Sequence, residues 1–574
     1  MPEQLILRVA VPAPLHHSFD YLPPPDATPG QLIPGVRVRV PFGRSERCGV
    51  LLELATLADV DGRRLKPAYA VLDAVPLFAA ADLALLRWAA GYYQHPLGEV
   101  IANALPVRLR KGEPPIPVLQ KIWSVTALGA RQDPAALRRA PKQAELLRLL
   151  LESRGGLVQE QIYQACGACR QALQALQAKG WVVAGERLPE AFTPPLPGQP
   201  APPLNADQPG AVEAIDPGCF GAYLLDGVTG SGKTEVYLAR VEKVLASGRQ
   251  ALVLVPEIGL TPQLIRRFER RLGMGLAVLH SGLAAGERES AWHLARLGHA
   301  AVVLGTRSAL FVPLPALGLI VVDEEHDLSL KQQDGFRYSA RDLAVIRAQR
   351  SDCPVILGSA TPSLETLQNA RGGRYRHLRL TRRAGAAMSA RMDLLDIRSV
   401  RMEAGLSPVL VQQLRETLAE GNQALLFINR RGYAPILTCH ACGWVAQCRR
   451  CDARMTLHAA SRLLWCHHCG SQRRQDVQCP ECGDADLRAL GQGTERVEEV
   501  LAGYFPEAGI VRIDRDTTRR KGSLDRMLGE IRKGKHSLLL GTQMLAKGHH
   551  FPDVTLVGIL DVDQGLFGAD FRAA

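Results

Sequence analysis

The stretch that decides the fold is YLLDGVTGSGKTEVYLARV, residues 223–241. An apolar run comes first, a loop with the pattern G-x-x-x-x-G-K-[ST] follows, and a helical pattern begins at Glu235. This order is typical of a phosphate site, because the glycines let backbone N–H groups approach phosphates at the positive end of the helix. The expected ATP-binding loop comprises Gly227, Val228, Thr229, Gly230, Ser231, Gly232, Lys233 and Thr234. Lys233 would neutralise the β- and γ-phosphates, and Thr234 would hold Mg²⁺.

A second acidic motif completes the expected nucleotide site. The apolar run 319–322 ends in Asp323, Glu324, Glu325 and His326. A carboxylate at the end of a neighbouring strand is where such sites bind their metal, so Asp323 is expected to hold Mg²⁺ and Glu324 to polarise the attacking water. Lys233, Asp323 and Glu324 form the expected catalytic set of an ATPase.

Apolar strands alternate with amphipathic helices around these motifs. A first set of strands is expected at 223–226, 251–256, 301–305, 317–323 and 354–358, and a second at 424–428, 538–541 and 554–561. Alternation of this kind builds parallel sheets covered by helices on both faces. The fold class is therefore multidomain α/β, with RecA-like lobes in tandem at residues 205–385 and 386–574.

Three further parts precede the lobes. Short alternating runs such as 36–40 and 49–54 predict a small β domain at 1–108. Helical spacing from Pro141, stopped at Gly180 and followed by a strand, predicts a winged helix at 109–186. Seven prolines between Pro189 and Pro203 indicate an extended linker at 187–204.

Length, charge and hydropathy limit the function classes. A chain of 574 residues that is 47% hydrophobic can fill several cores. Its net charge of +12 suits a polyanionic partner, although many basic proteins bind no nucleic acid. The absence of a long apolar window and of a signal-like start predicts a cytoplasmic protein without a membrane partner.

Eight of the thirteen cysteines form four Cys-x-x-Cys pairs within 44 residues, from Cys439 to Cys482. The pairs are Cys439 with Cys442, Cys448 with Cys451, Cys466 with Cys469, and Cys479 with Cys482. Each pair can supply two thiolates to a tetrahedral ion, so the sequence predicts two closed zinc sites of structural type. Spacing leaves open which pairs share an ion. Cys166 and Cys169 lack a partner pair nearby and are expected to pack between helices.

More motifs follow in an order that carries a family resemblance. They are LNADQ at 204–208, PEIGLTPQ at 256–263, GTRSALF at 305–311, GSATP at 358–362, NRRG at 429–432 and GTQMLAKGHHFP at 541–552. With the DEEH box at 323–326, they resemble superfamily-two helicases. Over nearly its whole length the chain resembles the PriA family of bacterial replication-restart helicases.

The resemblance implies an ATP-dependent 3′-to-5′ DNA helicase that recognises stalled forks and D-loops and initiates primosome assembly. The implied partners are forked and single-stranded DNA, the acidic tail of single-strand-binding protein, other primosome proteins and the helicase-loading machinery, with a monomer as the family state. It implies that Gln208 reads adenine and that residues 323–326 couple ATP to DNA. It also implies a zinc module at 436–485 with nested pairing, in which Cys439, Cys442, Cys479 and Cys482 hold one ion and Cys448, Cys451, Cys466 and Cys469 the other.

Candidate DNA-binding residues come from three segments. The family's pocket for a 3′ end matches Phe19, Asp20, Gly43 and Lys66, which otherwise read as a core ring and polar hairpin groups. Arg307 of the GTRSALF motif suits a single-strand backbone. The aromatic-rich loop of the family matches Phe336, Arg337 and Tyr338, whose rings must be exposed if they are to stack on bases; simple core packing is the alternative.

The chain departs from the family at its end. It stops at Ala574, before the QVAGRAGR motif that presents an arginine to the γ-phosphate. Because such an arginine is worth about 10³- to 10⁵-fold in rate, the second lobe is expected to be incomplete and ATP turnover to be uncertain. The alternative function is therefore an ATPase-deficient, truncated fork-binding scaffold. An RNA helicase or restriction-type translocase would share the motor but leave the zinc cluster unexplained.

Overall fold

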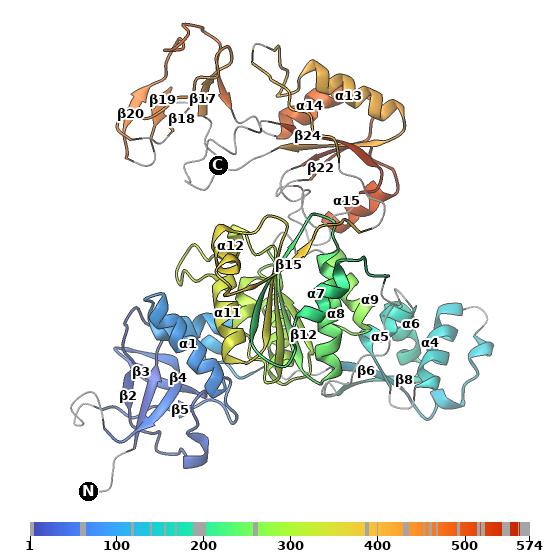
Figure 1. Ribbon diagram of the computed structural model, residues 1–574. Coiled ribbons are helices and arrows are strands. Elements are labelled where there is room, and N and C mark those ends of the chain that lie inside the picture. The colour runs from blue at the N-terminus through green and yellow to red at the C-terminus, as the bar shows by residue number, and fades with distance from the viewer. Residues whose placement is uncertain are drawn as a thin grey trace. The chain divides into compact units, whose positions relative to one another are not determined.

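The computed structural model divides the chain into two compact units (Figure 1). One comprises Met1–Glu257 with Arg267–Ala387, and the other Ile258–Arg266 with Met388–Ala574. The structure describes residues 5–57, 65–115, 120–137, 140–153, 156–166, 169–187, 202–256, 262–384, 390–398, 400–428, 436–451, 454–458, 462–466, 469–490, 494–513, 517, 523–541, 551–560 and 562. None of the helices within these ranges combines the length and the apolar character that crossing a bilayer requires.

A seven-stranded parallel sheet forms the centre of the first unit, in the order β11-β12-β10-β13-β14-β9-β15. Its strands are β9 (Gly221–Gly227), β10 (Gln250–Leu254), β11 (Ala277–Leu279), β12 (Val302–Gly305), β13 (Leu317–Asp323), β14 (Pro354–Ser359) and β15 (Arg376–Leu380). The described helices beside it are α7 (Gln208–Ala214), α8 (Lys233–Ala246), α9 (Pro262–Leu272), α10 (Ala285–Arg296), α11 (Ala340–Arg350) and α12 (Leu364–Arg371), with short 3₁₀ turns at Arg307–Phe311 and Leu328–Leu330. Every residue of β10 and β14 is buried. Unbroken apolar runs of this kind are what a sheet covered on both faces requires.

The amino-terminal part, blue in Figure 1, is an antiparallel sheet in the order β2-β1-β4-β3-β5. It contains β1 (Ile6–Ala10), β2 (Phe19–Tyr21), β3 (Arg37–Phe42), β4 (Ser45–Ala55) and β5 (Ala70–Val71), the helices α1 (Ala80–Tyr92), α2 (Leu97–Ala104) and α3 (Val107–Arg110), and a 3₁₀ turn at Pro29–Gln31. The indole N–H of Trp292 on α10 donates to the carbonyl of Ala104 at 3.2 Å. The Trp292 ring also meets Phe78 edge-on, so the β domain shares a packed core with the lobe.

A smaller sheet in the order β7-β6-β8 follows. It comprises β6 (Gln120–Val125), β7 (Leu157–Val158) and β8 (Val182–Arg187), with α4 (Pro141–Glu152), α5 (Gln159–Cys166), α6 (Arg170–Ala178) and 3₁₀ turns at Gly129–Arg131 and Pro134–Ala136. Helices on a three-stranded sheet match the winged-helix expectation. Cys166 and Cys169 are buried in its apolar cluster, which confirms their interpretation as packing residues.

The second unit contains a four-stranded parallel sheet in the order β22-β23-β16-β24. Its elements are β16 (Gln423–Ile428), β22 (Ile510–Ile513), β23 (Leu538–Gly541), β24 (Val554–Leu560), α13 (Pro408–Ala419), α14 (Thr494–Tyr504) and α15 (Ser523–Arg532). A separate antiparallel sheet carries the cysteines and interrupts the chain between β16 and α14. Its strands are β17 (Ile436–Cys439), β18 (Thr456–His458), β19 (Leu463–Trp465), β20 (Gln472–Arg474) and β21 (Leu487–Leu490), in the order β20-β19-β18-β17-β21. The expected interruption of a second α/β set is therefore present.

Candidate nucleotide site, zinc centres and nucleic-acid surfaces

Three expected motifs meet at one edge of the large sheet. The glycine-rich loop follows β9, the DEEH box follows β13, and GSATP begins in β14, which pairs with both strands. Because parallel strands end at the same edge, the order β13-β14-β9 places GSATP between the other two motifs. The topology therefore brings together residues that lie far apart in the sequence.

The loop has the backbone of a phosphate cradle. Gly230 and Gly232 both have φ near +79°, a region that residues with a Cβ rarely enter, and Gly232 caps α8 directly. The Lys233 ammonium donates to the carbonyl of Gly227 at 2.9 Å. The hydroxyl of Ser231 is buried and has no hydrogen-bond partner among the described residues. A buried donor beside left-handed glycines at a helix start fits an anionic ligand.

Gln208 is buried against this loop. Its amide donates to the carbonyl of Ser231 at 2.9 Å, and its oxygen accepts from the backbone N–H of Asn205 at 2.8 Å. A Cβ on Gly232 would lie 2.2 Å from the Gln208 amide nitrogen, so glycine is needed for this contact. Gln208, which is expected to read adenine, therefore lies beside the phosphate loop, and both its amide nitrogen and its amide oxygen form hydrogen bonds within the protein.

The acidic motif carries a partly buried carboxylate and a strained residue. Asp323 accepts from the Tyr237 hydroxyl at 2.9 Å, and burial together with the neighbouring Glu324 raises the Asp323 pKa to about 6. Glu324 has φ of +48°, unusual for a residue with a side chain, and strain of this kind is concentrated at functional sites. The carboxylates and the Thr234 hydroxyl are oxygen donors, which suit Mg²⁺.

The last two residues of the box connect it to GSATP. His326 Nδ1 lies 2.7 Å from the Ser359 hydroxyl. The Glu325 side chain is fully buried and accepts from the backbone N–H of Ser363 at 2.7 Å, the Ser363 hydroxyl at 2.9 Å and the Thr366 hydroxyl at 2.8 Å. The Arg341 guanidinium lies 3.3 Å from the same carboxylate. A two-sided polar network thus fixes the box to the start of α12.

Glu325→Gln is expected to lower the unfolding free energy of the first unit by about 2–4 kcal/mol. The glutamine amide would place an NH₂ group opposite hydrogen-bond donors, and Arg341 would lose the negative charge of its buried partner. Urea denaturation followed by circular dichroism measures the change. Glu365→Gln is the matched control, because that side chain is 73% exposed at the edge of the same network. Equal urea midpoints for Glu325→Gln and Glu365→Gln would contradict the expectation.

The aromatic-rich loop differs from its expectation. Phe336 is 2% and Tyr338 5% exposed. The Phe336 ring packs against Tyr93 and His95 of the amino-terminal domain at centroid distances of 5.8 and 5.3 Å, and Tyr338 packs edge-on to Phe311 at 4.8 Å. The expected exposure of these rings is therefore wrong for this structure, because tertiary packing provides them with an aromatic cluster instead of solvent.

Two basic residues near that cluster have different environments. Arg337 is exposed, while Arg307 donates to the carbonyl of Ser329 at 2.9 Å. That bond ties the GTRSALF segment to the 3₁₀ turn after the DEEH box. Of the motifs that carry the family resemblance, residues 257–261, 429–432 and 542–550 lie outside the described residues.

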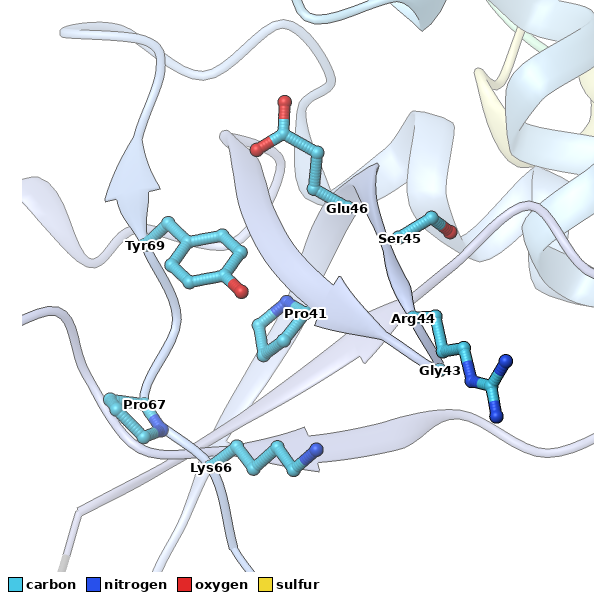
Figure 2. A pocket seen from close by; sticks show the side chains of 8 residues that line it. All are labelled: Pro41, Gly43, Arg44, Ser45, Glu46, Lys66, Pro67 and Tyr69. Carbon is cyan, nitrogen blue, oxygen red and sulfur yellow. The ribbon is translucent and has the colours of Figure 1, made fainter.

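Two of the four candidates for a 3′ end, Phe19 and Asp20, lie in β2 of the amino-terminal sheet, and the other two, Gly43 and Lys66, lie outside its strands and line a pocket. Gly43 and Lys66 line a cavity of about 440 Å³, whose other lining residues are Pro41, Arg44, Ser45, Glu46, Pro67 and Tyr69 (Figure 2). Phe19 stands edge-on to Phe42 at 5.1 Å, directly before the Gly43 turn. The Asp20 carboxylate is only 3% exposed and accepts from Arg8 at 3.1 Å. Arg8 is a partner that the sequence did not reveal.

The eight cysteines gather into two groups. Cys439, Cys442, Cys479 and Cys482 form one, and Cys448, Cys451, Cys466 and Cys469 the other, with ligand atoms within 4.8 Å of one another in each. Opposed sulfurs lie 3.5 to 3.6 Å apart, close to the roughly 3.8 Å edge of a tetrahedral ZnS₄ site. The backbone N–H of Arg450 lowers the pKa of Cys448 to about 6, which favours the thiolate. The nested pairing that the resemblance implied is confirmed.

Sequence reasoning missed the tyrosine that contacts Asp323. Tyr237 lies four residues after Lys233, so helical periodicity places it on the same face of α8. That spacing was the available signal. It did not reveal which strand the face would meet, because strand order is a property of the folded sheet.

The fold and the sites together define a helicase-type nucleic-acid motor with a cysteine-rich zinc module. Three family models match: the 3′ DNA-binding domain of PriA at residues 8–106, the DEAD/DEAH box helicase at 205–370, and the cysteine-rich region of the PriA DNA helicase at 448–474. The chain is 45% identical to the replication restart protein PriA of Haemophilus influenzae over 99% of its own length and 78% of the relative's, and 35% identical to that of Bacillus subtilis over 98% and 78%. The chain belongs to the PriA family of replication restart helicases. A solved RecG structure bound to a three-way DNA junction is a distant likeness, at 17% identity over 62% of this chain and 38% of that one, with a TM-score of 0.37.

Proposed function

We propose that this chain is an ATP-dependent DNA helicase that moves 3′ to 5′, recognises stalled forks and D-loops, and initiates primosome assembly for replication restart. The observation that carries the proposal is the pocket at Gly43 and Lys66 in the same compact unit as the phosphate loop and DEEH box. A site that binds the 3′ end in the same unit as an ATPase lobe can couple fork binding to ATP hydrolysis.

In this proposal each site residue has one task. Gln208 and the loop residues 227–234 hold ATP, Thr234 and Asp323 hold Mg²⁺, and Glu324 polarises the attacking water. Bound Mg²⁺ supplies charge neutralisation at the β- and γ-phosphates. Phe19, Asp20, Gly43 and Lys66 receive the leading-strand 3′ end, and Arg307 and Arg337 contact the strand backbone. The chain acts as a cytoplasmic monomer, with single-strand-binding protein and primosome proteins as partners.

Lys66→Ala is expected to weaken binding to a fork whose leading-strand 3′ end lies at the branch by about three- to tenfold, because one charge-assisted phosphate contact is lost. Fluorescence anisotropy with labelled forks measures it. Lys111→Ala is the control, since Lys111 is exposed directly after α3 of the amino-terminal part and does not line the pocket. A fork with the leading-strand end recessed far from the branch should be bound equally by the wild-type chain and the Lys66 variant.

The direction of movement needs a separate test. ATP-dependent unwinding is compared on duplexes that carry either a 3′ or a 5′ single-stranded tail. Unwinding of the 3′-tailed duplex alone supports the proposed polarity. Tight fork binding without hydrolysis would instead support a fork-binding scaffold, and preference for the 5′ tail would contradict the polarity.

A further inference from the structure

The hydroxyl of Tyr237 lies where three motifs of the nucleotide site meet. Tyr237 is 1% exposed and lies on α8, four residues after Lys233 of the phosphate loop. Its hydroxyl donates to Asp323 Oδ1 at 2.9 Å. A side chain of the phosphate-loop helix thus holds the carboxylate of the acidic box.

Gly358 of GSATP provides the space for that hydroxyl. It pairs with Asp323 across β13 and β14, and its carbonyl accepts from the backbone N–H of Glu325 at 3.0 Å. A Cβ at position 358 would lie 1.6 Å from the Tyr237 oxygen and 2.7 Å from its Cζ. No real Cβ approaches a heavy atom so closely, so an alanine would have to displace the ring. The glycine and the tyrosine therefore form a matched pair.

Two donors orient the Asp323 carboxylate in this arrangement. The Tyr237 hydroxyl is one, and the backbone N–H of Glu324 is the other. A carboxylate that binds a metal gains affinity when a hydrogen bond from a neighbouring group holds its orientation. Phenylalanine would fill the same space as Tyr237 but would remove one of the two donors that orient the carboxylate.

We infer that Tyr237 is a positioning residue that orients Asp323 toward the divalent cation of a bound nucleotide. The inference rests on the proposed ATP site and deepens it. Tyr237 touches neither phosphate nor base in this role. Its loss should therefore weaken the contribution of the metal to nucleotide binding and leave metal-free binding unchanged.

The test compares binding of a fluorescent ADP analogue in Mg²⁺ with binding in EDTA. For Tyr237→Phe, the ratio of the two affinities is expected to fall about ten- to a hundredfold, which is what the loss of a hydrogen bond to a metal ligand typically costs in metal affinity. Tyr223→Phe is the matched control. Tyr223 is equally buried in β9, and its hydroxyl accepts from the backbone N–H of Asp216 at 3.0 Å, away from Asp323.

A second variant approaches the same hydroxyl from β14. Gly358→Ala is expected to lower the melting temperature and to lower the Mg²⁺-to-EDTA ratio as Tyr237→Phe does. Adding Tyr237→Phe removes the oxygen nearest the new methyl group, so the double variant should melt higher than Gly358→Ala alone. Strictly additive losses of stability would show that the two residues do not share this space.

The outcomes separate the inference from the proposed function. If the wild-type chain binds the analogue without any gain from Mg²⁺, the proposed metal site itself fails. If the wild-type chain gains from Mg²⁺ and Tyr237→Phe keeps the full gain, the inference is overturned while the site stands. A loss of binding in EDTA as well would also overturn it, because Tyr237 would then support the loop rather than the metal ligand.

Discussion

Lys233→Ala is expected to reduce DNA-stimulated ATP hydrolysis by about 10²- to 10³-fold, because the ammonium that faces developing phosphate charge is lost. Lys233 donates to the carbonyl of Gly227, so the ammonium already lies next to the phosphate loop. With alanine at this position, bound phosphates would keep the neutral donors of the loop, including the Ser231 hydroxyl, but would lose the positive charge of Lys233. The steady-state rate with and without single-stranded DNA measures the effect.

Lys243→Ala is the matched control for that experiment. Lys243 lies in the last turn of the same helix and is exposed, so its removal changes the net charge equally without touching the loop. Fork binding measured in parallel separates loss of catalysis from loss of fold. Turnover by Lys233→Ala at the rate of Lys243→Ala would exclude this loop as the hydrolytic site.

Five of the seven strands of the first lobe's sheet could be predicted because they are buried on both faces, whereas the two edge strands, β11 and β15, escaped prediction. The expected strand at Leu317–Asp323 is β13 itself, and the expected run 301–305 differs from β12 by one residue. Continuous apolar runs of this kind need no partner to be recognised. The phosphate loop, the acidic box and the cysteine pairs could also be predicted, because the functional residues of each motif lie close together in the sequence.

Contacts between elements could not be predicted in the same way. From its sequence, the aromatic-rich loop is predicted to be a polar segment whose rings are exposed. The folded chain places Tyr93 and His95 of another domain against Phe336. Whether a ring is exposed depends on a surface that lies far away in the sequence. The same reason hides the Tyr237 contact with Asp323, because helical spacing defines a face but leaves its neighbour open.

Loss of zinc is expected to unfold the cysteine-rich module while both parallel sheets remain. Cys466→Ser removes a sulfur that is fully buried in the inner group, beside Leu464 of β19. The chain should then carry one zinc instead of two, measured by inductively coupled plasma mass spectrometry. Binding of a structural zinc supplies about 10–16 kcal/mol of folding free energy, far more than the module's small apolar cluster can supply without it.

Cys219→Ser is the matched control, since Cys219 is exposed and belongs to neither group. It should keep two zinc ions and the wild-type digestion pattern. Limited proteolysis of Cys466→Ser should cut within 436–490 and spare the amino-terminal and helicase parts, because the module is an insertion between β16 and α14 with an antiparallel sheet of its own. Retention of two ions by Cys466→Ser would show that the inner sulfurs bind no metal. Cleavage throughout the chain would show that the module supports the lobe's fold as well as its own.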